Sequence, residues 1–262
     1  MKKFILSLAA AVCAFSAANA QVEVSGGVDI VSASIWRGTT CGGPSIQPGA
    51  TVSYAGFSAT AWASQEICAS GQAAAELDFT FAYSIAGFTV AYTNYWWTPG
   101  TPYFEKDTHM SEITLGYEFG ESFPLAISIN TIVAGEQDTK INYATKDLKE
   151  GQVKDQAFST YIDFSYPFAI GSVDCTANLG ITPWAGMYSG SYINPCYSYY
   201  DEVEGEDVDG YYSKGFQVAS VGLSFSKTIF ETEKFALPLF VSTSFSPAQR
   251  EAYLVAGMSF GF

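Results

Sequence analysis

Seven carboxylates in this chain stand at alternate positions between apolar residues. The pattern is clearest in Glu76-Leu-Asp-Phe-Thr80. Carboxylates that line a narrow passage attract cations and repel anions. Together with Arg37, these seven are the candidates for a solute-facing surface: Asp29, Glu76, Asp78, Glu112, Glu118, Asp163 and Asp174. The alternative is that they bond to one another, to tyrosines and to solvent, and only fill an interior.

A second acidic group lies in the segment from Asp201 to Gly210, which holds six carboxylates in ten residues. Hard cations such as Ca²⁺ favour clusters of oxygen ligands. The spacing fits no EF-hand loop, and blocks of like charge are usually solvated. We therefore predict an acidic loop and no metal site.

The chain has a single histidine, His109, with Ser111 two residues away. Nucleophilic catalysis requires a nucleophile and a base at hydrogen-bond distance, with a third group that orients the base. No other serine lies in a recognisable nucleophile motif. We expect no catalytic residue, no enzymatic activity and no cofactor, and a lipid hydrolase is the weakest alternative.

The carboxylates need strands to position them, and the chain end shows the clearest strand. Leu254, Ala256, Met258, Phe260 and Phe262 fall on one face of a period-2 pattern. A last strand that pairs with the first leaves no open sheet edge. This ending resembles that of outer-membrane barrels, and the resemblance implies recognition of the strand ending in Phe262 by the barrel-assembly machinery.

The whole chain divides into about twelve such strands. They are predicted at 22–36, 45–54, 57–66, 76–85, 88–97, 112–119, 124–134, 158–166, 173–182, 215–229, 236–245 and 252–262. A phase shift between Val218 and Val221 indicates a β-bulge. A short connection is predicted at 167–171, after the eighth strand.

Connections after the even-numbered strands are short, and those after the first five odd-numbered strands are longer. This alternation favours an all-β fold, a transmembrane antiparallel up-and-down β-barrel of about 12 strands. A soluble β-sandwich is the alternative.

The amino terminus has the features of a secretory signal. Lys2 and Lys3 precede an apolar run, and Ala18-Asn-Ala20 is a small-x-small cleavage site. We predict a signal peptide at 1–20, cleaved near Ala20, and one barrel domain at 21–262. The chain of 262 residues has a net charge of −14, which makes nucleic acid an improbable partner.

Four cysteines follow the signal: Cys41, Cys68, Cys175 and Cys196. An oxidising compartment permits disulfides, and the sequence cannot choose among three pairings. Cys41 and Cys68 fall in the first two long loops, so a bridge between them is one hypothesis.

Three segments resemble the opening of the TorF-type porins. They are Ile30-Val-Ser-Ala-Ser-Ile-Trp-Arg-Gly38, Gly43-Pro-Ser-Ile-Gln-Pro-Gly49 and Gly56-Phe-Ser-Ala-Thr-Ala-Trp-Ala-Ser64. Later segments, such as His109-Met-Ser-Glu-Ile-Thr, are similar as well. The resemblance implies a porin-like barrel in the outer membrane of a Gram-negative bacterium and names no solute.

From these features we expect passive diffusion of small solutes through a narrow, cation-preferring lumen, surrounded by outer-membrane lipid. Twelve strands lie between eight-stranded barrels, which side chains fill, and open sixteen-stranded ones. Several aromatic residues are also predicted to point inward: Trp62, Trp97, Tyr161, Trp184 and Phe240. The alternative is a filled structural or binding barrel that presents long acidic and aromatic outer loops.

Overall fold

The computed structural model describes residues 21–67, 73–97, 103, 105, 108–138, 156–189, 200–201, 206–207, 215–232 and 235–261. The predicted signal peptide, Cys68, Cys196 and Phe262 lie outside these residues. No helix in the described part of the chain is long and apolar enough to cross a membrane.

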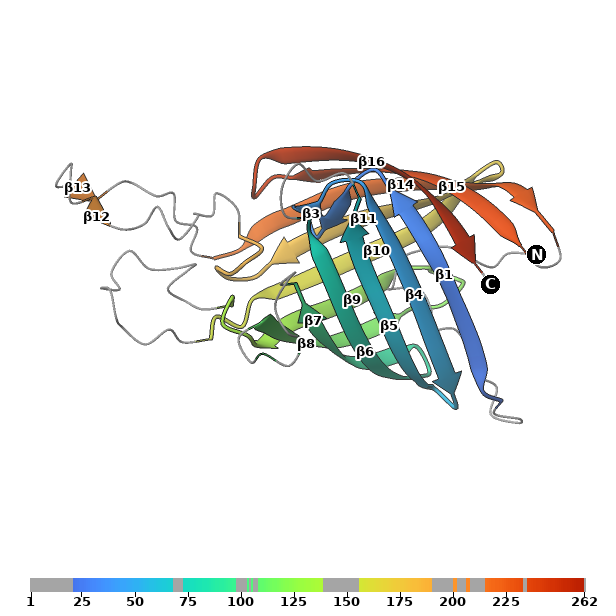
Figure 1. Ribbon diagram of the computed structural model, residues 1–262, viewed down its shortest axis with the longest axis horizontal. Helices are drawn as coiled ribbons and strands as arrows, with labels where there is room; N and C mark the ends of the chain where they lie inside the picture. Colours follow the sequence, from blue (N-terminus) through green and yellow to red (C-terminus); the bar gives the residue numbers. More distant parts are fainter. Residues whose placement is uncertain are drawn as a thin grey trace.

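Twelve antiparallel strands form one closed barrel (Figure 1). They are β1 (Glu23–Val31), β4 (Ser45–Tyr54), β5 (Phe57–Glu66), β6 (Ala75–Ile85), β7 (Phe88–Trp96), β8 (His109–Glu118), β9 (Ala126–Ala134), β10 (Thr160–Ile170), β11 (Val173–Thr182), β14 (Gln217–Glu231), β15 (Ala236–Ser246) and β16 (Glu251–Gly261). Two further pairs are β2 (Ser34–Trp36) with β3 (Thr39–Gly42), and β12 (Tyr200–Asp201) with β13 (Glu206–Asp207). The predicted fold class is confirmed.

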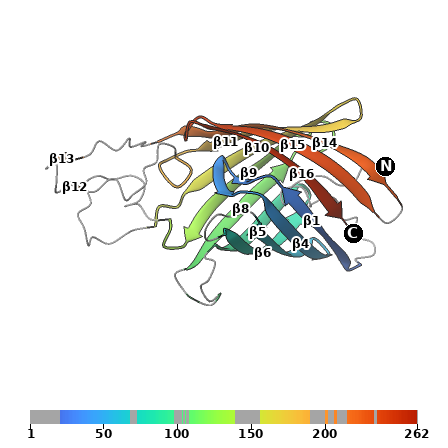
Figure 2. The ribbon, with the colours of Figure 1, turned by 45° about the horizontal axis from the view of Figure 1, so that its top comes forward.

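The last strand closes the barrel on the first. Asp29 is opposite Ser259, and Val31 is opposite Gly257, in the antiparallel register of β1 and β16. Closure leaves no unpaired edge along the sheet. β1 begins and β16 ends at the same end of the barrel, and β12 and β13 lie beyond the other (Figures 1 and 2).

Connection lengths alternate as predicted. Tight turns at 55–56, 86–87 and 171–172 join neighbouring strands at one end of the barrel, which we call the short-turn end. Ala55 and Gly56 have φ values of 49° and 87°, the left-handed backbone of a two-residue hairpin turn. The longer connections lie at the opposite end, which we call the loop end.

The predicted first strand is too long. β1 ends at Val31, and the chain then forms the separate β2–β3 hairpin. The Arg37-Gly38 pair makes this turn, with φ values of 51° and 84°. Positive φ at both central positions is the type I′ geometry, which matches the twist of the flanking strands.

A short connection joins β10 and β11 as predicted, but its predicted bounds of 167–171 are wrong, because β10 continues through Pro167 to Ile170. Pro167 pairs with Thr176 of β11, whereas pairing with β9 stops at Ser165. Proline lacks the N–H that a central strand position would need, and it is tolerated where one side of the strand is unpaired.

The predicted bulge is confirmed. Gly180 is opposite Ser220 and Ile181 is opposite Val218, so Ala219 is the extra residue of β14. Its carbonyl accepts a hydrogen bond from Ser246 Oγ at 2.6 Å. The bulge therefore turns a backbone carbonyl toward the neighbouring strand at the loop end.

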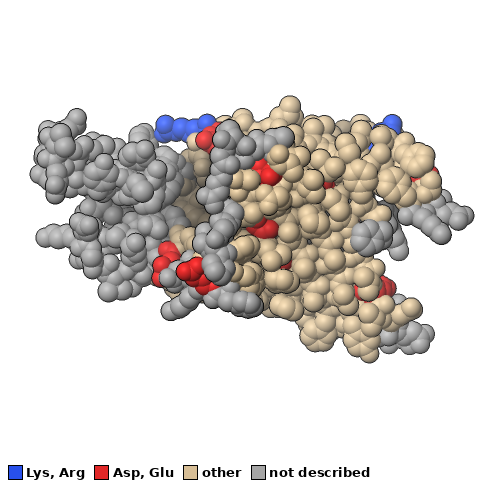
Figure 3. Space-filling view, in the orientation of Figure 1, with Lys and Arg blue, Asp and Glu red and all other residues tan. Residues whose placement is uncertain are grey.

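The outer surface of the barrel is apolar. Large side chains at alternate positions are strongly exposed, among them Val24, Phe57, Ile85, Leu115 and Leu254. Figure 3 shows one such face, on which few charged residues interrupt the other residue types. The intervening residues, many of them Ser, Thr, Gly and acids, face the interior.

Candidate functional site

The β2–β3 hairpin crosses the interior of the barrel at the loop end. A Cβ atom on Gly38 would lie 2.8 Å from the carbonyl oxygen of Ala219 in β14 and 3.1 Å from Ser246 Cβ. Only glycine permits this approach at a positive φ. The hairpin begins after β1, so its tip reaches strands that are not its neighbours in the barrel.

The side chain at the tip, Arg37, binds the far wall. Its two terminal nitrogens donate to Glu112 of β8, at 2.5 Å to Oε2 and 2.9 Å to Oε1. Nη1 also donates to the hydroxyl of Tyr188 at 2.5 Å. Tyr95 donates to Glu112 Oε1 at 3.0 Å. A bidentate guanidinium–carboxylate contact fixes the orientation of the two side chains in addition to pairing their charges. Arg37 therefore holds the hairpin across the lumen.

Aromatic rings surround this ion pair. Trp36 contacts Tyr95, Trp97 and Tyr188, each with ring centroids 5.5 Å apart. The guanidinium carbon of Arg37 lies 4.6 Å from the Trp36 ring and 5.0 Å from that of Tyr161. Such cation–π contacts are stronger where water is excluded. Arg37, Glu112 and these five rings form what we call the collar.

Apolar side chains pack against the collar. Met110 and Ile132 are 1% and 0% exposed, and they form a cluster with Tyr95. Glu112 is 1% exposed and Tyr188 is 2% exposed. The loop end of the lumen is therefore densely filled at this level.

The short-turn half of the lumen differs. Most of its inward side chains are small and half-buried, and hydroxyl pairs bridge adjacent strands, as Thr51 with Thr60 at 2.8 Å and Ser84 with Thr89 at 2.9 Å. Trp62 and Phe240 also point inward, against Gly49 and Gly257. The short-turn half of the interior is thus largely polar, and we call it the vestibule.

All seven predicted carboxylates lie on the inward face of their strands. Asp29 is opposite Gln47 and Ser259, Asp163 is opposite Ser128 and Gly180, and Asp174 is opposite Ser226. Glu118 is half-buried at the short-turn end of β8. Glu112 belongs to the collar.

Glu76 and Asp78 lie side by side on β6, near the collar. Trp97 Nε1 donates to Glu76 Oε1. Asp78 is 4% exposed, and its Oδ1 has no hydrogen-bond partner among the described residues. The structure therefore brings Glu76, Asp78, Glu112 and Arg37 to one level of the lumen, and leaves Asp29, Glu118 and Asp174 in the vestibule.

Two features of the collar were missed from the sequence. The predicted strand at 22–36 would leave Arg37 just past its end, whereas Arg37 is the tip of an inward hairpin. The signal existed, because Arg-Gly between Ser34-Ile-Trp36 and Thr39-Thr-Cys41 is a two-residue hairpin pattern. Tyr188 lies in the connection after β11, and no local pattern marks it. Trp184 was predicted to point inward, but it lies beyond β11 and is 45% exposed.

The other candidate groups have structural partners. His109 Nδ1 contacts Asn94 Oδ1 at 2.8 Å and Nε2 contacts the Tyr103 carbonyl, whereas Ser111 bonds to Tyr92. In the described ranges, His109 therefore forms no serine–histidine pair. Cys41 forms no disulfide with any described residue, and because Cys68 lies outside the described residues the bridge between them stays a prediction. Of the acidic segment, only the backbone of β12 and β13 is described.

Comparisons with known proteins give a resemblance among solved structures. No protein-family model matches the chain, and no curated protein matches it. Among solved structures, the chain is similar to an outer membrane channel from Pseudomonas putida F1, with a TM-score of 0.45 and 10% sequence identity. The similarity covers 91% of this chain and 94% of that one.

Proposed function

We propose that this protein is an outer-membrane barrel that admits small solutes by passive diffusion through a narrow, cation-preferring lumen. The observation that carries the proposal is the combination of an apolar outer surface with an inner wall that bears seven carboxylates and a hairpin that places Arg37 inside the barrel. No bond chemistry and no energy coupling is involved.

The outer surface supports a membrane location. Soluble proteins rarely expose apolar patches of more than a few hundred Å². In hydrocarbon, every backbone polar group needs an internal partner, which a closed barrel supplies. The strand lengths of 9 to 15 residues in this barrel suffice for a tilted crossing of the apolar layer, which takes about 9–11 residues.

Charge and size would then select the solute. Seven carboxylates against one guanidinium favour cations inside the lumen. Arg37 is bound to Glu112, so its charge is largely compensated and does not repel a passing cation. The collar sets the size limit, because the hairpin and its rings occupy the section that a solute must cross.

A second candidate function is a filled barrel whose outer loops bind a partner. The dense collar favours it, since Tyr188, Met110 and Ile132 leave little exposed surface at that level. In this case the acidic and aromatic loop segments would carry the function.

Single-channel conductance of the refolded mature protein in a planar bilayer separates the two. We expect discrete steps and, under a salt gradient, a cation-preferring reversal potential. Anion preference would still support a channel, but it would refute the acidic lumen as the source of its ion selectivity. A folded, heat-modifiable barrel that never conducts would favour the filled barrel.

A further inference from the structure

One lysine interrupts the apolar outer face of β14. Lys227 follows Val221, Leu223 and Phe225 at two-residue spacing and is exposed. It forms no ion pair among the described residues, and no other Lys or Arg of the described strands faces outward. A lysine on the lipid side of a barrel is costly at the middle of the bilayer and far less so near its surface.

The register puts Lys227 near the short-turn end. Lys227 is opposite Leu239 of β15, and the preceding Ser226 is opposite Asp174 of β11. Val173 begins β11 directly after the turn at 171–172. The ammonium group is therefore within reach of the membrane surface on the short-turn side.

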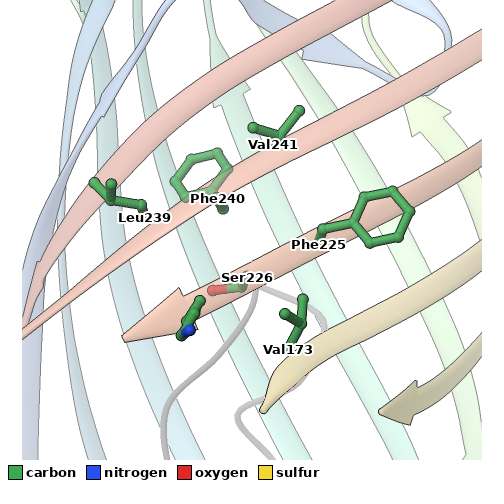
Figure 4. Close-up of a pocket in the computed structure, with 7 residues that line it drawn as sticks. Val173, Phe225, Ser226, Leu239, Phe240 and Val241 are labelled. Atoms are coloured by element: carbon green, nitrogen blue, oxygen red, sulfur yellow. The ribbon is translucent and has the colours of Figure 1, made fainter. Parts of the chain in front are cut away.

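Beside Lys227 the wall has a shallow apolar depression with a cavity volume of about 130 Å³ (Figure 4). Val173, Phe225, Leu239 and Val241 line it, from three adjacent strands. A β-bulge between Thr228 and Phe230 lies next to it, and bulges bend and twist the strand locally. An apolar cavity of about 150 Å³ accommodates a benzene-sized hydrocarbon, so this one has room for part of an acyl chain.

We propose that this depression binds a phospholipid with an anionic headgroup, drawn from the leaflet on the short-turn side. One acyl chain lies against Leu239 and Val241, and the headgroup phosphate accepts hydrogen bonds from the Lys227 ammonium group, which has three donors. The proposal rests on the membrane location proposed above, and it does not depend on conduction.

Native mass spectrometry of the refolded full barrel tests the site, with phosphatidylglycerol and phosphatidylcholine of identical acyl chains as probes. We expect the wild type to retain phosphatidylglycerol about fivefold better. That preference corresponds to about 1 kcal/mol for one lysine near an anionic surface. Lys227→Gln should abolish the preference, whereas Arg250→Gln, a matched loss of charge in the turn after β15, should keep it.

A second pair of variants tests the depression itself. Val241→Trp fills it and should lower retention of phosphatidylglycerol, whereas Val221→Trp, on the outer face of β14 but outside the depression, should not. Equal retention of both lipids by the wild type, or an unchanged preference in Lys227→Gln, overturns the proposal. Conductance is read on the same samples. A conducting barrel without lipid preference refutes only the lipid site, and a silent barrel with the preference refutes only the channel.

Discussion

Arg37 and Glu112 are 75 residues apart in the chain, and their side chains meet inside the barrel at 2.5 and 2.9 Å. One comes from the tip of the β2–β3 hairpin and the other from the wall. This ion pair holds the connection between the neighbouring strands β1 and β4 across the lumen.

Glu112→Gln should destabilise the barrel by about 3 kcal/mol, because it leaves a buried guanidinium without its counter-charge. The double variant Arg37→Met, Glu112→Leu should recover much of this loss, since it removes both charges. Urea unfolding in lipid vesicles measures both. Glu118→Gln is the control, an inward carboxylate on the same strand, and equal effects of E112Q and E118Q would contradict the role of the pair.

Gly38→Ala should destabilise the barrel more than Gly120→Ala does. Both glycines have positive φ values, 84° and 89°. An alanine at either position therefore lowers the free energy of unfolding by about 1–2 kcal/mol, because it must adopt a left-handed backbone. Only at Gly38 does a Cβ meet backbone, at 2.8 Å from the Ala219 carbonyl, whereas Gly120 has nothing within 4 Å. We expect the Gly38 variant to lose about 1–3 kcal/mol more. Equal losses would show that the tip does not press on β14.

Asp29→Asn and Asp174→Asn should each lower the cation-to-anion permeability ratio by up to roughly fivefold. A unit charge about 8 Å from the solute path stabilises a cation and destabilises an anion by ~0.5 kcal/mol each in water, so the ratio changes by about 1 kcal/mol. The reversal potential under a salt gradient measures the ratio. Asp29→Glu and Asp174→Glu keep the charge and should leave the ratio unchanged. If the Asn variants behave like the Glu variants, the vestibule carboxylates do not set selectivity.

Asp138 should make the stability of the loop end depend on pH. Its carboxylate accepts hydrogen bonds from Ser159 Oγ, from Ser159 N at 3.2 Å and from Gln156 Nε2 at 2.5 Å. Burial nevertheless raises the pKa of Asp138 above its usual value. A raised folded-state pKa stabilises the fold below the unfolded pKa of about 3.9, and this stability is lost as pH rises through the folded value.

The test compares the wild type with Asp138→Asn, which does not titrate. The free energy of unfolding of the wild type should fall relative to the variant as the pH rises above the unfolded pKa of about 3.9. Parallel curves, or a steeper fall in the variant, would refute this.

The barrel could be predicted because its local signals agree. Ser45–Tyr54 and Phe57–Glu66 alternate without interruption and meet at Ala55-Gly56, a pair suited to a tight turn, so their predicted bounds match the structure. The seven carboxylates follow from the same alternation, since one residue of shift would move every side chain to the other face.

The collar could not be predicted in the same way. Strand periodicity continues through Ser34-Ile-Trp36, and it does not reveal that the chain has left the wall. Tyr188 contacts Arg37 through tertiary packing between segments that are distant in the sequence, and no local sequence pattern indicates such a contact. Pro167 likewise fits a turn by composition, and only the partial pairing of β10 explains why it lies within a strand.

The hairpin also has a bearing on the order of assembly. Ser32, where the chain leaves the wall, donates its N–H to the Ala256 carbonyl at 2.8 Å and accepts from Ala256 N at 2.9 Å. Ala256 belongs to the last strand. The residue that directs the hairpin inward is thus bonded to the strand that completes the barrel. These two hydrogen bonds can form only once the last strand has joined the first, so the start of the hairpin is fixed to the seam only when the barrel closes.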